Sequence, residues 1–365
     1  MHDAERVRKN NYDLIRLFAA AQVVLVHAVN HLGVEAHAGL MKIVHLFPGV
    51  PIFFFISGFL IARSFESNSR LAEYAQNRIL RIYPALFTCF FLSILSVWAV
   101  GYWATVSVDW ADYMSWSVAQ LSLAQFYNPD FLRGYGVGAL NGALWTITVE
   151  LQFYVLVPMI YALFRLQDGS LRRKNIILLL LIGVFLLLNR AYHGIDPQYQ
   201  EALWKKLLGV SFAPWFYMFL IGVLVQSNFS FFYRLLAGRF AIFLVAYLAC
   251  ALWAKPYWGL HGGNEFSPLL YLPLVAVIFS AAYSASDLSR RLLGRHDISY
   301  GVYIYHMPII NACLYLGYRG EVEYLLWVVS ATLVMAILSW RVVERPSLKL
   351  KKHPLNPLNF SADKA

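Results

Sequence analysis

The sequence predicts an all-α fold, a polytopic integral membrane bundle of about ten transmembrane helices with both termini in the cytoplasm. Three observations lead to this fold class. Of the 365 residues, 59% are apolar and 14% are charged, whereas a soluble domain carries about 25% charged residues. Apolar stretches of about 20 residues, the length that crosses a bilayer, recur along the chain. The segments between them alternate in their content of basic residues.

Ten stretches are predicted to span the bilayer: 12–33, 48–66, 79–101, 144–164, 175–190, 209–227, 238–254, 268–284, 298–317 and 324–342. The basic residues before the first stretch are typical of a signal peptide. That stretch contains Asp13, Arg16 and His27 and lacks a small-residue cleavage site, so we expect it to be retained as a helix. We expect a transmembrane domain over 1–348 and a basic tail over 349–365 on the cytoplasmic membrane surface.

The distribution of Lys and Arg supports this topology. With the N-terminus in the cytoplasm, 22 of the 30 basic residues fall in cytoplasmic segments and 7 in outer segments, while Arg16 lies inside the first span. This asymmetry is the positive-inside bias of membrane proteins. We therefore attribute the net charge of +10 to contact with membrane lipids, and we expect no nucleic-acid partner.

The first span carries a polar stripe. Arg16 and His27 are 11 residues apart, which places them on one helix face, separated by about 16 Å along the axis. Asp13 lies one turn before Arg16. Ionisable groups inside a bilayer are costly and usually have a function. The alternative is that Arg16 reaches back to the membrane surface and His27 only hydrogen-bonds a neighbouring helix.

Two later spans also contain ionisable groups. Glu150 lies near the outer end of its predicted span, with Trp145 before it and Tyr154 one turn after it. His306 lies within the predicted ninth span. A carboxylate in this setting needs a partner or a chemical role, so a structural ion pair is the alternative for Glu150. A packing histidine with satisfied hydrogen bonds is the alternative for His306.

Arg78 and Arg81 lie at the predicted cytoplasmic mouth of the third span. Residues three apart share a helix face, and guanidinium groups bind phosphate in bidentate fashion. The pair is therefore a candidate site for a phosphorylated ligand, with ordinary positive-inside anchoring as the alternative.

Near the C-terminus, the adjacent charges of Glu344 and Arg345 precede Pro346 and indicate a helix stop and surface anchor.

A glycine in the second predicted span and a long outer loop are further features of the sequence. Gly58, next to Ser57, is expected to permit close helix packing, and Ser57 lacks the Gly-x-Ser-x-Gly context of a nucleophile. The outer loop from about 101 to 142 ends in a glycine-rich run, which we expect to be flexible. Its tryptophans are candidates for stacking on sugar rings or for an interfacial aromatic belt: Trp103, Trp110 and Trp116.

Taken together, six segments resemble the acyltransferase 3 family, the membrane acyltransferases of bacterial surface glycans. They occur in the family's order across nearly the whole chain. The segments are Arg16 with His27, the run 49–60, Arg78-x-x-Arg81-Ile82-Tyr83-Pro84, Leu144-Trp145-Thr146 with Glu150 and Phe153-Tyr154, Ser299-Tyr300 with Tyr303, Tyr305-His306 and Pro308, and Glu344-Arg345-Pro346.

The resemblance implies ten helices in the bacterial inner membrane and an acyl-CoA donor, usually acetyl-CoA, taken from the cytoplasm as a substrate, with no permanently bound cofactor. It implies as acceptor a sugar hydroxyl of a glycan or lipid-linked glycan, met on the outer side. Compact members resemble O-acetylases of O-antigen and exopolysaccharide. Relatives acting on lipochito-oligosaccharides or macrolides, or with succinyl donors, leave the substrate open.

The stripe and the resemblance together suggest a mechanism. Arg78 and Arg81 would hold the phosphates of CoA, the pantetheine arm would pass Arg16, and the thioester would lie near His27. An imidazole suits removal of the proton from a sugar hydroxyl. Glu150 would orient His27 or polarise the acceptor, and whether His27 is acylated stays open. A glycolipid or polysaccharide transporter, or flippase, is the alternative function, because buried charges suit it as well.

Overall fold

The computed structural model describes residues 9–35, 38–258, 266–294 and 296–351. Within these residues the regular elements are helices, and strands are absent. Most of the predicted tail, 352–365, lies outside the described residues. The longest helices are α2 (Tyr12–Leu32), α4 (Gly49–Ser67), α5 (Leu71–Ala99), α7 (Trp145–Leu163), α8 (Leu171–His193) and α16 (Val322–Ser339).

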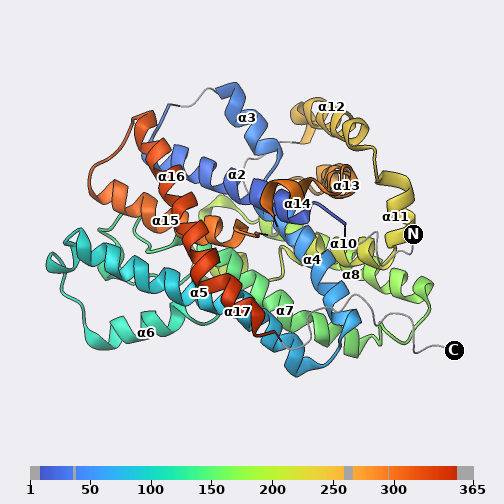
Figure 1. Cartoon of the computed structure of the whole chain (residues 1–365), viewed down its shortest axis with the longest axis horizontal. Coiled ribbons are helices and arrows are strands. Elements are labelled where there is room, and N and C mark those ends of the chain that lie inside the picture. The colour runs from blue at the N-terminus through green and yellow to red at the C-terminus, as the bar shows by residue number, and fades with distance from the viewer. Residues whose placement is uncertain (1–8, 36–37, 259–265, 295, 352–365) are drawn as a thin grey trace.

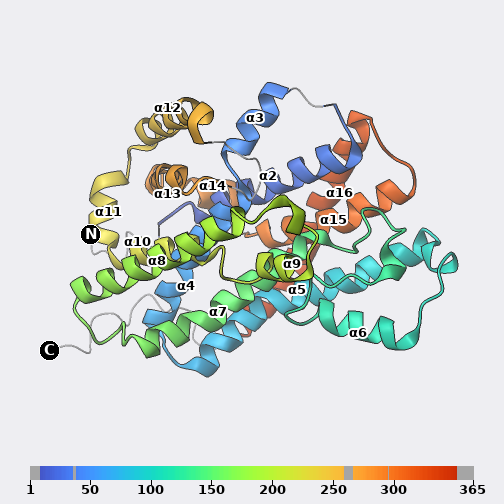
Figure 2. The same cartoon turned by 180° about the vertical axis from the view of Figure 1, so that it is seen from behind.

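The remaining helices are shorter. They are α3 (Ala38–Leu46), α6 (Trp110–Gln120), α9 (Leu203–Gly209), α10 (Phe216–Ser227), α11 (Phe229–Leu236), α12 (Phe240–Trp258), α13 (Pro268–Tyr283), α14 (Leu288–Leu293), α15 (Ser299–Tyr315) and α17 (Arg345–Lys349). A π-helical turn, Trp340–Glu344, joins α16 to α17. Figures 1 and 2 show α4 crossing the middle of the bundle, with α3, α11 and α12 at its edge.

Each of the ten predicted spans overlaps a helix, but fewer helices meet the length and hydropathy expected of a simple span. Among the described residues, six do so, and a seventh is counted if α10 and α11, which are bent by 90° at their junction, form one span. The helices α12 and α13 contain shorter apolar segments. The chain is thus a helical, multi-pass membrane protein. The predicted number of ten spans is not confirmed, because six or seven helices of the described residues meet these criteria.

The centre of the bundle is built on close contact between α4 and α10. A Cβ atom added at Gly58 would lie 2.0 Å from the carbonyl oxygen of Phe219, and one added at Gly222 would lie 2.2 Å from that of Phe55. The predicted packing role of Gly58 is therefore confirmed. Because lipid tails are as apolar as side chains, such close approach, which increases van der Waals contact, favours helix association in a membrane.

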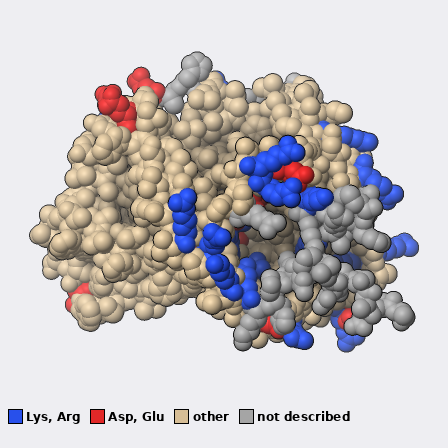
Figure 3. Space-filling model, in the orientation of Figure 1, with Lys and Arg blue, Asp and Glu red and all other residues tan. Residues whose placement is uncertain are grey.

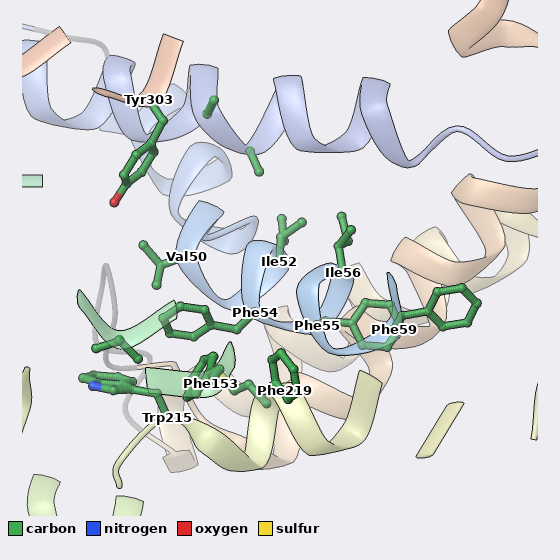
Figure 4. Packing of buried hydrophobic residues seen from close by; sticks show 14 of the residues in the cluster. Val50, Ile52, Phe54, Phe55, Ile56, Phe59, Phe153, Trp215, Phe219 and Tyr303 are labelled. Atoms are coloured by element: carbon green, nitrogen blue, oxygen red, sulfur yellow. The ribbon is translucent and has the colours of Figure 1, made fainter. Parts of the chain in front are cut away.

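Aromatic side chains fill the space around this contact. Phe55, Phe59, Phe153 and Phe219 are fully buried, and the rings of Phe153 and Phe219 lie 4.9 Å apart. Figure 4 shows this cluster, with Tyr303 and Trp215 at the same end of it as Val50. The rigid packing fixes the positions of α4 and α7, which carry polar residues of the candidate site.

The two ends of the bundle differ in charge. We call "the basic end" the end formed by residues 67–71, 163–171, 284–294 and 340–351, and "the loop end" the end formed by residues 100–144 and 194–215. In Figure 3 the Lys and Arg side chains gather over the part of the molecule that carries α14 and α17, and none is visible over α6. This asymmetry agrees with the predicted orientation, in which the basic end faces the cytoplasm.

The long loop at the loop end is held in place by α15. The side chain of Asn311 accepts a hydrogen bond from the amide of Val137 at 3.0 Å and donates to the carbonyl oxygens of Ala139 and Leu140. Gly136 has a φ of +56°, and a Cβ there would lie 2.2 Å from Asn311 Oδ1. The glycine-rich run, which the sequence indicates to be flexible, is anchored at Gly136, where the absence of a side chain permits a tight contact between the loop and α15.

Candidate active site

A charge cluster lies inside the basic end, where three elements meet. Arg16 of α2 donates to Asp297 Oδ2 at 2.6 Å, and Arg81 of α5 donates to the same oxygen. The side chains of Arg16, Arg81 and Asp297 are 19%, 15% and 12% exposed. Asp13 lies close enough to interact electrostatically with all three. The cluster ties α2 and α5 to the segment that starts α15.

Asp297 is ionised in this setting. Burial alone would raise the pKa of its carboxyl group, but the guanidinium groups of Arg16 and Arg81 outweigh burial and hold the pKa below its ordinary value. The Ser299 hydroxyl and amide add hydrogen bonds of 2.5 and 3.2 Å to the other carboxylate oxygen, Oδ1. Asp297 was not identified from the sequence, because a carboxylate just before a span resembles an ordinary loop charge.

Glu344 belongs to the interior rather than to the surface. It is 2% exposed, accepts from Ser339 at 3.1 Å, and lies 4.0 Å from a guanidinium nitrogen of Arg81. The prediction of a surface anchor built from Glu344 and Arg345 was wrong for Glu344. The π-helical turn at 340–344 changes the helical register that the sequence alone would give, and the carboxylate is buried there.

Arg78 and Arg81 have different partners, although they share a helix face. Arg78 donates to Ser64 at 3.4 Å and lies over the rings of Tyr74 and Tyr154, at 5.8 and 5.7 Å from their centroids. Among the described residues it forms no ion pair, and its Nε has no hydrogen-bond partner. Arg78 therefore has capacity to bind an external anion.

Lys351 adds another positive charge near Arg78. Burial, and after it the neighbouring cations Arg78, Arg81 and Arg16, lower the pKa of Lys351 to about 8, against an opposing effect of Asp297. Crowded cations that depress the pKa of a lysine form a favourable place for an anion, since an anion relieves their mutual repulsion. The residues at this end therefore suit a phosphate group.

Glu150 of α7 is linked to neighbouring hydroxyl groups. Its Oε1 accepts from Ser57 of α4 at 2.8 Å and from Tyr154 at 2.5 Å. Among the described residues no hydrogen bond joins Glu150 to His27, so the structure gives no support to the expectation that Glu150 orients this histidine. Ser57 therefore has a polar partner in addition to its place beside the packing glycine.

A narrow cavity connects Glu150 with Arg16. Its volume is about 30 Å³, and its lining includes Phe53, Thr146 and Tyr303. The hydroxyl of Tyr303 lies 2.6 Å from that of Thr146, so these two lining residues are joined to each other. A cavity of this size admits a water-sized group, so passage of a larger substrate requires a side chain such as Tyr303 to move. From the sequence, Thr146 and Tyr303 were conspicuous only as members of longer segments and not individually.

His27 and His306 form a direct pair between α2 and α15. His27 Nδ1 lies 2.9 Å from His306 Nε2, and His306 Nδ1 lies 2.6 Å from the carbonyl oxygen of Tyr303. A carbonyl can only accept, so His306 carries its proton on Nδ1 and its Nε2 accepts in the neutral ring. His27 must then donate through Nδ1. Its Nε2 is left with a lone pair, and no hydrogen bond joins it to another described residue.

The surroundings of this pair are not those of a metal site. No group of three or more His, Cys, Asp or Glu side chains with metal-binding geometry occurs within the described ranges. His306 is fully buried, whereas His27 is partly exposed. The geometry therefore makes His27 the outer member of the pair, with the unprotonated nitrogen, and makes His306 the residue that fixes its tautomer.

The tryptophans of the long loop separate into two groups. Trp116 is fully buried and packs against Phe90 and Phe131, with Trp103 partly buried beside it. Trp116 cannot stack on a sugar, and that part of the expectation was wrong. Trp110 is 71% exposed. Trp145, at the start of α7, instead pairs with Trp215, their ring centroids 5.5 Å apart.

Comparison with known proteins gives matches over nearly the full length. Nodulation protein 10 of Rhizobium leguminosarum bv. viciae is 30% identical over 94% of this chain and 94% of its own length. The O-acetyl transferase of Shigella phage Sf6 is 27% identical over 93% of this chain and 96% of its own. The O-acetyltransferase OatA of Staphylococcus aureus is 23% identical over 83% of this chain, which spans 53% of that protein.

No solved structure matches this chain significantly. A family model described as an acyltransferase domain matches residues 9–344, which include the arginines of the basic end, Glu150 and both histidines of the pair. The chain therefore belongs to the acyltransferase 3 family.

Proposed function

We propose that this membrane acyltransferase moves an acyl group, in the first place acetyl, from cytoplasmic acyl-CoA to a sugar hydroxyl of a surface polysaccharide or of its lipid-linked precursor. The names of two relatives, an O-acetyl transferase and an O-acetyltransferase, support the O-acetyl product. The inner membrane is the location that fits a cytoplasmic donor and an outer acceptor.

The observation that carries the proposal is the orientation of His27. His306 accepts from its Nδ1, so the Nε2 of His27 is free to take a proton. A sugar hydroxyl is a poor nucleophile until a base removes its proton, and histidine performs this work near neutral pH. A histidine whose tautomer is fixed by a neighbour is the arrangement that such a base requires.

The donor end of the proposal rests on the basic cluster. Arg78 has no carboxylate partner among the described residues, and Lys351 lies near it. Both suit the phosphates of CoA, while Arg16 and Arg81 are already paired with Asp297. Arg16 and Asp13 would then guide the arm of the donor past the charge cluster rather than hold its phosphates.

The chemical step follows from these positions. His27 Nε2 takes the proton of the acceptor hydroxyl, and the oxygen attacks the carbonyl carbon of the thioester. The carbon–sulfur bond breaks, and the CoA sulfur leaves with the proton that His27 returns to it. Transfer through an acylated His27 would use the same nitrogen. Glu150, which lines the narrow cavity and accepts a 2.5 Å hydrogen bond from Tyr154, would position the donor arm there.

The test is the release of CoA by the purified protein in lipid nanodiscs, with cell-surface polysaccharide of the source strain as acceptor. The proposal predicts that free CoA appears together with O-acetyl groups on the polysaccharide, measured by a thiol reagent and by NMR. If the protein moves glycolipid across a bilayer and neither binds nor consumes acetyl-CoA, the transporter alternative replaces this proposal.

A further inference from the structure

A second, larger cavity lies at the loop end. Its volume is about 560 Å³, within the range of about 300–1,000 Å³ that is usual for sites of small ligands. The cavity lies between the long loop before α7 and the segment 192–215, which includes α9; Figure 2 shows the side of the molecule on which α9 lies. Its lining includes Gln125, Asn128, Asn141, Trp145, Tyr192 and Trp215.

The lining combines aromatic rings with amide groups. Trp145 and Trp215 lie 5.5 Å apart at an angle of 51°, and Tyr192 lies 6.0 Å from Trp215. Gln125, Asn128 and Asn141 supply side-chain amides, each of which can both donate and accept. A sugar ring presents an apolar C–H face to an aromatic ring and hydroxyl groups at its edge, so this composition suits a glycan.

Two of these amides have unused hydrogen-bonding capacity. The carbonyl oxygens of the Gln125 and Asn128 side chains are buried and have no hydrogen-bond partner in the described part of the chain. Gln125 is 1% exposed, and its amide nitrogen is held by the carbonyl of Ser122 at 3.0 Å. Because a buried acceptor without a partner is costly, such groups point to a ligand that donates hydrogen bonds, as sugar hydroxyls do.

The inner wall of the cavity adjoins the segment that carries His306. Asn141 donates to the carbonyl of Ile304 at 2.7 Å, and a Cβ at Gly142 would lie 3.9 Å from the end of the Met307 side chain. Trp145 lines this cavity, while its neighbour Thr146 lines the narrow cavity that reaches Arg16. The two cavities thus lie on either side of the same short segment.

We propose that the loop-end cavity is the acceptor site, in which Trp145, Trp215 and Tyr192 face the sugar rings and Gln125 and Asn128 accept hydrogen bonds from their hydroxyls. This inference rests on the proposed function, because it assigns the glycan partner of that reaction to a place. A phospholipid chain is the competing occupant. The buried amide oxygens argue against it, since an acyl chain offers them no donor.

The experiment blocks the cavity from the outside. Lys206→Cys and, as a second cavity position, Val210→Cys, both at residues without an assigned contact to the acceptor, are expressed in the source strain and treated with a bulky, membrane-impermeant maleimide. Trp110→Cys is the matched control, because Trp110 is on the same end of the molecule, is 71% exposed, and does not line the cavity. The measurements are O-acetylation of the surface polysaccharide and affinity of the purified, labelled protein for acetyl-CoA.

The proposal predicts that labelling either cavity variant lowers polysaccharide acetylation at least tenfold relative to its unlabelled form, while acetyl-CoA affinity stays within twofold of the control. Unchanged acetylation after complete labelling overturns the acceptor site, as does an equal loss in labelled Trp110→Cys. So does native mass spectrometry that finds a phospholipid displaced by the label while acetylation continues. If the unlabelled wild type neither binds nor consumes acetyl-CoA, the proposed function itself has failed.

Discussion

The charge cluster at the basic end and the histidine pair in the bundle are both buried polar groups, but they differ in what they leave unpaired. The charges of Arg16 and Arg81 are both paired with the carboxylate of Asp297. The histidine pair leaves one nitrogen, His27 Nε2, without a partner among the described residues. A closed network stabilises a fold, whereas an open group in a defined orientation is available for chemistry. This difference predicts that substitutions in the two regions have different kinds of effect.

The largest effect is expected at His27. His27→Gln removes the basic nitrogen, and loss of general-base catalysis lowers the transfer rate by about 100- to 10,000-fold. The variant leaves His306 Nε2 able to accept from the new amide, so membrane abundance is expected to stay normal. His27→Ala is a less suitable variant, because truncation would leave His306 Nε2 without its hydrogen-bond partner. O-acetyl groups on the polysaccharide, measured by NMR, check the prediction.

Asp297→Ala should lower the stability of the folded protein, and not only its activity. It leaves Arg16 and Arg81 buried without a counter-charge, and breaking such a buried pair costs about 3–5 kcal/mol. Asp287→Ala is the control, because its ion pair with Arg290 is exposed and such pairs contribute about 0–1 kcal/mol. Denaturant titration of both variants in detergent measures the difference. Equal stabilities of the two variants would show that the cluster is not the closed network described above.

A smaller effect is expected on donor binding at Arg78. Arg78→Ala should weaken CoA affinity by about 1.5–3 kcal/mol, roughly 10- to 100-fold, if this arginine contacts a phosphate. The single variant is a cleaner test than joint replacement with Arg81, which would also break the pair with Asp297. Arg70→Ala serves as the control, since Arg70 is 74% exposed and pairs with Glu73. Calorimetry that finds the same affinity in both variants removes the phosphate role.

The smallest effect is a change in proton binding. The pKa of Lys351 is about 8 because of burial and nearby cations. An anion bound among these cations raises that pKa, so the complex holds more protons than the free protein at and above pH 8. CoA binding at pH 8.5 should therefore take up a fraction of a proton, which calorimetry in buffers of different ionisation enthalpy detects. Proton release on binding, or no exchange, would place the phosphates elsewhere.

The sequence predicted the helices well because their apolar runs are long and their loop charges asymmetric. It also identified every arginine and histidine of the site, since ionisable residues inside apolar stretches are conspicuous. The partners were less predictable. Asp297 contacts Arg16 across 281 positions of sequence, and such pairing depends on how helices pack rather than on local spacing. Similarly, the burial of Glu344 depends on a π-helical turn that no local pattern indicated.

The loop end also shows a limit of prediction from sequence. Three tryptophans of the long loop were conspicuous, but Trp116 is buried inside its own small cluster. The open cavity is instead lined by Trp145 and Trp215, which come together from segments 70 residues apart in sequence. Aromatic content predicted that this end contains a surface rich in rings, and only the three-dimensional arrangement shows which rings face a cavity.

The roles of His27 and Arg78 are separated most sharply by the initial rate of CoA release, measured for His27→Gln and Arg78→Ala in parallel over a range of acetyl-CoA concentrations with saturating acceptor. We expect His27→Gln to lose kcat and to keep the acetyl-CoA affinity of the wild type, and we expect Arg78→Ala to raise KM and to keep most of kcat. A His27→Gln protein that is correctly inserted and retains the wild-type kcat would contradict the claim that the open nitrogen of the histidine pair performs the chemistry.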